Sequence, residues 1–124
     1  QSLMTTLGAR LVRVQTGEVD IAAPIQQGSL QQQGFAHAGL TFAIGDSAAG
    51  YAALSLLPMD QEVLTTELKI NLLAPGAGER LIARGRVIKP GRRSMVVQSD
   101  VFAVKDRQER HIALLTGSMM PVPI

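Results

Sequence analysis

One carboxylate in the middle of the chain is the residue best placed to do chemistry. From residue 39 to residue 57, ten of nineteen residues are Gly, Ala or Ser, most of the others are large and apolar, and Asp46 is the only charged one. A carboxylate among apolar side chains can act as a general base or as a nucleophile. It can equally be a structural acid that a buried partner satisfies, so the residues around Asp46 have to decide between the two roles.

The same run predicts the element that positions Asp46. Its apolar residues fall on all sides of a helical projection, which is typical of a helix that is buried on every face. We expect one helix over residues 38–56, which Pro58 ends. A membrane span would not carry a central carboxylate and several glycines, so we expect the buried helix of a soluble protein.

The segments on either side of this helix alternate between apolar and polar residues, as strands do. Residues 11–15 and 18–25 flank Gly17 and indicate a hairpin. Further strands are expected at 64–72, 80–89, 94–104 and 111–119, with turns at 75–78, 90–91 and 105–109. Short connections favour antiparallel neighbours. Since a sheet that buries one helix must wrap around it, we predict an α+β hotdog fold: five or six antiparallel strands around one long buried helix, in a single domain over residues 1–124.

The overall composition excludes several classes of function. With a net charge of +2 and 3% aromatic residues, the chain lacks the basic surface and stacking platforms of nucleic-acid binders. The absence of cysteine excludes disulfides, thiolate nucleophiles and cysteine zinc sites, and is compatible with a reducing cytoplasm. His37 and His111 are far apart in sequence and predict no metal cluster. We therefore expect a cytoplasmic protein with no cofactor, no metal, and no nucleic-acid or membrane partner.

The start of the predicted helix carries a recognisable motif. Gly34-x-x-His37-Ala38-Gly39, followed by Asp46, resembles the His-Gly-Gly…Asp signature of hotdog-fold acyl-CoA thioesterases, above all of the phenylacetate-degradation (PaaI-like) branch. Residues 64–75 resemble the second signature of that branch, and residues 91–93 stand where the family has a Gly-Arg or Gly-Lys turn. The resemblance covers nearly the whole chain. Dehydratases and non-catalytic acyl-CoA binders share the same fold.

The resemblance implies a role for each residue of the motif. Asp46 corresponds to the general base or nucleophile that acts on the thioester, and the N–H groups of Ala38 and Gly39 correspond to those that polarise its carbonyl. Gln31 corresponds to the residue that places the attacking water or the carbonyl, and Thr65 to a residue that hydrogen-bonds the carboxylate or the water. The family also implies a site shared across a homodimer, or across a homotetramer that is a dimer of dimers, with Asp46 and Thr65 of one subunit facing Gln31 and Ala38 of the other.

Elementary geometry is consistent with these roles. A helix start offers unpaired N–H groups and a positive dipole end, which suit a developing oxyanion. Along one helix, Asp46 lies more than two turns beyond Ala38, too far for both to act on one carbonyl, whereas two chains related by a twofold axis remove the difficulty. His37 belongs to the motif and is thus a candidate catalytic residue. Because it lies nine residues before Asp46, on the opposite side of the helix, we interpret it as structural.

A basic run covers the strand expected at 80–89 and the turn that follows it. Residues 80–93 contain Arg80, Arg84, Arg86, Lys89, Arg92 and Arg93 and no acid. Such a run is usually a solvated sheet face, but it can equally receive the phosphates of coenzyme A. The candidates for that contact are Lys89, Gly91, Arg92 and Arg93.

We therefore predict an acyl-CoA thioesterase that releases a carboxylic acid and free coenzyme A. The alternative is a non-catalytic acyl-CoA or acyl-carrier binding module on the same fold, which would have no use for a buried base such as Asp46. A hotdog dehydratase would need a catalytic His–Asp pair, which the helical offset of His37 disfavours. The acyl group stays open; candidates for the wall of its pocket are Tyr51, Leu54, Leu72 and Met95.

Overall fold

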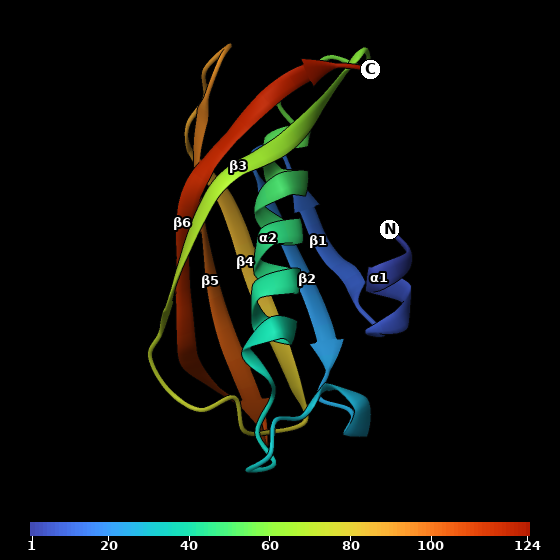
Figure 1. Cartoon of the computed structure of the whole chain (residues 1–124), viewed down its shortest axis with the longest axis vertical. Helices are drawn as coiled ribbons and strands as arrows, with labels where there is room; N and C mark the ends of the chain where they lie inside the picture. Colours follow the sequence, from blue (N-terminus) through green and yellow to red (C-terminus); the bar gives the residue numbers. More distant parts are fainter.

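One long helix lies inside a curved sheet in the computed structural model, which describes all 124 residues (Figure 1). This helix, α2, spans Ala38–Leu54, so the predicted helix over 38–56 is confirmed apart from its last residues. The strands are β1 (Arg10–Gln15), β2 (Glu18–Pro24), β3 (Gln61–Leu72), β4 (Arg80–Lys89), β5 (Met95–Lys105) and β6 (Gln108–Pro123). Two short helices, α1 (Ser2–Thr6) and η1 (Gln27–Ser29), complete the fold. All strand pairs are antiparallel, and the predicted hotdog fold is confirmed.

The order of the strands in the sheet is β1-β2-β4-β5-β6-β3. The expectation that short connections join neighbours is wrong for β3 and β4, because β3 pairs with β6 at the edge of the sheet. The connection 73–79 instead follows the end of the sheet, where Leu73 N–H donates to the Ile112 carbonyl and Glu79 N–H to the Val104 carbonyl. β6 is longer than the predicted 111–119 because β3 pairs with it as far as Pro123.

The middle of α2 lies directly against the centre of the sheet. A Cβ atom added to Gly85 on β4 would overlap the backbone of Ala48, and one added to Gly45 would come within 2.8 Å of the Leu115 side chain. Between them, the buried Ser99 hydroxyl donates to the Gly45 carbonyl at 2.6 Å. Gly85, Ser99 and Leu115 are neighbours across β4, β5 and β6. A single row across the sheet thus supports the middle of the helix.

One face of α2 is open in the single chain. Leu40, Ile44 and Ala48 are buried, whereas Phe42 is 38% exposed and Asp46 is half-buried. The strands β1 and β3 are the two free edges of the sheet and do not pair with each other, so the sheet does not close around the helix. The expectation of a helix buried on every face is therefore wrong for one chain. None of the helices has the combination of length and hydropathy that a membrane span requires.

A bulge in β3 changes which of its side chains face the helix. The register with β6 shifts between Thr65 and Glu67, which leaves one extra residue on β3. Before the bulge Val63 packs against the core, and after it Leu68 does. Leu64, by contrast, is 54% exposed, so it does not share a face with Leu68 as strict alternation over 64–72 predicts. A bulge re-aims the residues beside it, and here it turns Thr65 toward α2.

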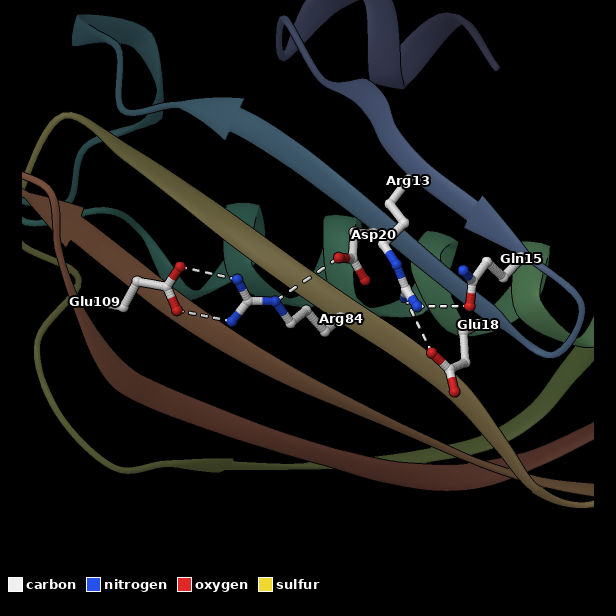
Figure 2. A network of polar contacts seen from close by, with 6 residues as sticks. All are labelled: Arg13, Gln15, Glu18, Asp20, Arg84 and Glu109. Atoms are coloured by element: carbon white, nitrogen blue, oxygen red, sulfur yellow. Dashed lines mark hydrogen bonds and ion pairs between the residues drawn. The ribbon is translucent and has the colours of Figure 1, made fainter.

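The face of the sheet away from α2 carries a network of charged side chains (Figure 2). Arg84 donates hydrogen bonds to both carboxylate oxygens of Glu109, at 2.7 and 2.8 Å, and its Nε lies 3.7 Å from the Asp20 carboxylate. The hydrogen bond from Arg84 lowers the pKa of Glu109, whereas burial raises the pKa of Asp20. Arg86 lies 3.6 Å from Asp100. These two arginines of the basic run therefore belong to a polar outer sheet face.

The contact at Gly85 predicts a large effect of a small substitution. Gly85→Ala should destabilise the protein by about 1–3 kcal/mol, because the added methyl group forces the helix backbone away from the sheet. Gly28→Ala is the matched control, since nothing lies within 4 Å of the added Cβ. Urea unfolding of both variants tests this; equal stabilities would contradict the close helix–sheet contact.

The Arg84–Glu109 pair predicts a pH-dependent contribution to stability. The pKa of Glu109 is lowered in the folded state. The pair therefore stabilises the fold fully at pH values above the ordinary glutamate pKa of 4.5, and this stabilisation is lost as the pH falls through the folded-state pKa. The difference in stability between the wild type and Glu109→Gln should therefore shrink as unfolding is measured at progressively lower pH. Glu67→Gln removes an exposed acid that has no ion pair and is the control. The same pH trend in both variants would contradict the assignment.

Candidate active site

The start of α2 is held by a side-chain cap. His37 is the N-cap residue, and its Nδ1 accepts a hydrogen bond from Gly39 N–H at 2.7 Å. Its own N–H donates to the Ser29 carbonyl at 2.8 Å, which ties the cap to the preceding loop. A side-chain acceptor at this position satisfies one of the orphan N–H groups of the first turn. The cap is a structural role, in agreement with our interpretation of His37.

This cap leaves one free N–H group at the helix start. Gly39 N–H is occupied by His37, and the N–H groups of Leu40 and Thr41 donate to the His37 carbonyl. Ala38 N–H makes no hydrogen bond within the chain. Of the two N–H groups that the motif implies as oxyanion donors, Ala38 thus has the unpaired one.

Gln31 lies in the loop that leads to the helix, where its side chain closes a turn. The side-chain Oε1 of Gln31 accepts hydrogen bonds from the backbone N–H groups of Gln33 and Phe35. The backbone N–H of Gln31 donates to the Phe35 carbonyl at 2.8 Å. Gly34, with φ of 87°, lies inside this turn. The Gln31 amide is therefore already engaged in the loop, next to the helix start.

Asp46 and Thr65 are brought together by α2 and β3. The Thr65 hydroxyl donates to Asp46 Oδ1 at 2.7 Å, the hydrogen bond that the family resemblance implied. Asp46 is half-buried, makes no ion pair, and its Oδ2 has no hydrogen-bond partner in the chain. An oriented carboxylate with one free oxygen can take a proton from water or attack a carbonyl carbon.

Two cavities flank α2 and divide the motif residues between them. The helix-start cavity, of about 490 Å³, is lined by Gln31, His37 and Ala38 and by the segment after β3. The carboxylate cavity, of about 730 Å³, lies between α1, α2 and the start of β3, and Asp46 and Thr65 line it. One chain therefore does not bring Asp46 together with Ala38.

The carboxylate cavity includes residues that the motif does not single out. Phe42, Ala43 and Gly50 lie one helical turn before or after Asp46 and line the same cavity. Their spacing of three and four residues from Asp46 is the signal that could have identified them, because such residues share a helix face.

The four residues expected at the pocket wall lie in three different parts of the structure. Tyr51 and Leu54 line the carboxylate cavity, and Leu72 lines the helix-start cavity. The expectation for Met95 is wrong, because it is 1% exposed and packs with Met119 in a separate part of the core. An inward-facing strand residue of this length fills the space between sheet and helix instead of lining a cavity.

The basic turn between β4 and β5 is free of ion pairs. Lys89, Gly91, Arg92 and Arg93 are exposed, and none of the three cations is paired with an acid. The turn lies at the end of the sheet opposite the start of α2 (Figure 1). Its charges are thus available to an external anion.

The sheet around one helix, with a carboxylate of that helix held by a hydroxyl of the edge strand, defines a hotdog protein with one oriented acid on its central helix. Residues 33–109 match the model of the Thioesterase superfamily. The chain therefore belongs to this superfamily.

Solved structures of similar proteins support the assignment to this family. A thioesterase family protein from Silicibacter pomeroyi has a TM-score of 0.97 and is 42% identical, with 100% of this chain and 91% of that one covered. A mutant of the phenylacetic acid degradation protein PaaI from Thermus thermophilus has a TM-score of 0.83 and is 26% identical, with 97% and 98% covered. The resemblance to PaaI-like hotdog thioesterases is confirmed.

The curated relative is longer than the part that matches. A Pasteurella multocida protein, whose name assigns it provisionally as an esterase, is 29% identical over 92 residues. The match covers 74% of this chain and 64% of that relative, less than two thirds of its length.

The N-cap predicts separate effects for two substitutions of one residue. His37→Ala should cost about 0.5–2 kcal/mol of stability, because Gly39 N–H loses its acceptor. His37→Asn supplies a side-chain oxygen and should retain most of the stability. Urea unfolding measures both, and amide exchange at Gly39 should accelerate in His37→Ala only. Equal stabilities of the two variants would contradict the capping role.

Proposed function

We propose that this protein hydrolyses an acyl-CoA thioester to a carboxylic acid and free coenzyme A, at a site that two subunits share. The carboxylate cavity of one subunit would supply Asp46 and Thr65, and the helix-start cavity of the other would supply Ala38 and Gln31. The observation that carries the proposal is the division of these residues: an oriented carboxylate opens into one cavity, and the unpaired Ala38 N–H lies beside the other.

Distance supports a shared site. Ala38 and Asp46 are eight residues apart on α2, which corresponds to ~12 Å of helical rise. An oxyanion donor must lie about 3 Å from the reacting oxygen, and the attacking atom must lie about 3–3.5 Å from the reacting carbon. One chain cannot meet both requirements for one carbonyl group, whereas a twofold dimer can.

The free edge of the sheet supports the assembly. β3 is an edge strand of 12 residues with Leu64 and Leu72 exposed, and an unpaired edge of this kind invites pairing. Pairing along β3 would bring a second subunit beside Thr65 and hence beside Asp46. We propose a homodimer as the minimal active unit; a dimer of dimers would contain the same site.

The chemistry follows two routes that use the same residues. As a general base, Asp46 takes a proton from water while the water oxygen bonds to the thioester carbon; Ala38 N–H of the other subunit stabilises the oxyanion. The carbon–sulfur bond then breaks, and coenzyme A leaves as a thiolate. As a nucleophile, Asp46 itself bonds to that carbon and expels the thiolate, after which water cleaves the mixed anhydride. In both routes Thr65 orients the carboxylate.

The exposed cations of the β4–β5 turn are proposed to bind the phosphates of coenzyme A. Lys89, Arg92 and Arg93 have no acidic partner in the chain, so a phosphate would not have to displace one. Gly91 lets the turn form between them. A cytoplasmic location, where such thioesters are made and used, is compatible with the absence of cysteine.

Replacement of the Asp46 carboxylate should slow hydrolysis without weakening the binding of acyl-CoA. Asp46→Asn should lower kcat on the order of 10²-fold or more, as expected when a general base or nucleophile is removed. Affinity for acyl-CoA should survive, because the phosphates and the acyl chain are held by other residues. A panel of acyl-CoA substrates with a thiol-detecting assay measures this. Full activity of Asp46→Asn would contradict the role of Asp46 as base or nucleophile, and a wild type that binds acyl-CoA without releasing thiol would favour the binding module.

A mixing experiment tests whether the site is shared. Ala38→Pro removes only the N–H group, since proline is well tolerated at the first helical position. Mixing Ala38→Pro subunits with Asp46→Asn subunits should restore about a quarter of wild-type activity. Half of randomly formed dimers contain one subunit of each kind, and each such dimer has one intact site out of two. No recovery, with subunit exchange confirmed, would mean that the site is not divided in this way.

A further inference from the structure

Gly50 is a helical glycine that the packing of the fold does not require. It lies four residues after Asp46, on the same face of α2, and lines the carboxylate cavity. A Cβ atom added to Gly50 would meet only the end of the Met119 side chain, at 3.9 Å, which is an ordinary contact. Its φ is not positive. Alanine would therefore fit at this position, in contrast to Gly45 and Gly85.

Helix stability does not explain Gly50 either. Glycine in a helix interior is less stable than alanine, because it loses more backbone freedom on folding. Alanine would both fit at position 50 and stabilise the helix, yet glycine is present. This choice indicates that the empty space beside Gly50 has a use. The empty space at Gly50 belongs to the cavity that contains the Asp46 carboxylate.

The carboxylate cavity continues along α2 in the direction of Gly50. Gly50 and Leu54 both line it, and they lie ~6 Å and ~12 Å of helical rise beyond Asp46. A group that reacts beside Asp46 and extends in this direction must pass Gly50. With carbon–carbon bonds of ~1.5 Å in a zigzag, a butyryl chain ends before Gly50, whereas an octanoyl chain reaches beyond it.

The charge of the lining limits what can occupy this space. Asp46 and Glu62 both line the carboxylate cavity, and no lysine, arginine or histidine does. Phe42, Tyr51 and Leu54 supply apolar surface. A second carboxylate on the acyl group would be repelled, and a neutral apolar chain would be accepted.

We infer that Gly50 is a specificity-determining residue: it leaves open the path along α2 by which a neutral, apolar acyl chain longer than about four carbons enters the carboxylate cavity. This inference rests on the proposed thioesterase function, since it assumes that the acyl group reacts beside Asp46. It goes further by naming the class of acyl group and the residue that admits it.

The test compares Gly50→Ala and Gly50→Val with butyryl-, octanoyl- and succinyl-CoA as substrates. Gly50→Val should lower kcat/KM for octanoyl-CoA about 10-fold or more and leave that for butyryl-CoA within about twofold, because its side chain blocks only the longer chain. Succinyl-CoA should be a poor substrate of the wild type. Gly50→Ala should raise Tm by about 2–4 °C and show a smaller loss in the same direction. Gly28→Ala, a glycine with open space around it and away from the cavity, should leave the chain-length profile unchanged.

Binding separates this inference from the proposed function. Dissociation constants for the same thioesters are measured calorimetrically in the Asp46→Asn background, with and without Gly50→Val. Selective weakening of octanoyl-CoA binding by Gly50→Val supports the inference, even if the wild type hydrolyses none of the thioesters. A wild type without hydrolytic activity would overturn the proposed function alone. An unchanged ratio of octanoyl- to butyryl-CoA affinity, or loss of the dimer of Gly50→Val in sedimentation, would overturn the inference; the second result would assign Gly50 to contact between subunits.

Discussion

The close approach of α2 to the middle of the sheet is the contact on which the rest of the structure depends. Gly85 leaves the space that the Ala48 backbone fills, and Ser99 donates a buried hydrogen bond to the Gly45 carbonyl. Together these contacts fix the height of the helix above the sheet and its rotation about its own axis. Because consecutive helical residues are about 100° apart, a Gly45 that faces the sheet turns the next residue, Asp46, sideways toward β3.

Asp46 and the acids of the outer sheet face have different surroundings. On the outer sheet face, Glu109, Asp20 and Asp100 lie beside Arg84 or Arg86, so their charges are neutralised locally. Asp46 has no cation and is held only by the Thr65 hydroxyl. A hydroxyl fixes the direction of a carboxylate and leaves its charge for an incoming group. The surroundings, more than the residue type, separate an acid that supports the sheet from one that is available for chemistry.

Much of the fold could be predicted from periodicity, and the candidate site only in part. The apolar run around Asp46 predicted α2, and alternation predicted the strands, because both patterns reflect burial that is local along the chain. The pairing of β3 with β6 is a choice between distant segments and leaves no local pattern. The same is true of the His37 cap on Gly39 N–H, since whether a histidine nitrogen reaches an N–H group depends on the geometry of the loop.

The bulge in β3 has a consequence for how this family of sequences can change. Strand side chains alternate with a period of two, so Thr65 and Leu68, three positions apart, can both face α2 only because the bulge takes up one residue between them. Loss of that residue would restore regular pairing with Thr65 still opposite Met119 and Leu68 still opposite Gly117, so the hydroxyl would keep its direction toward Asp46. At this point of the edge strand the loss of a single codon therefore leaves the site intact, whereas a residue lost from a regular part of β3 moves the side chains on one side of the loss to the opposite face.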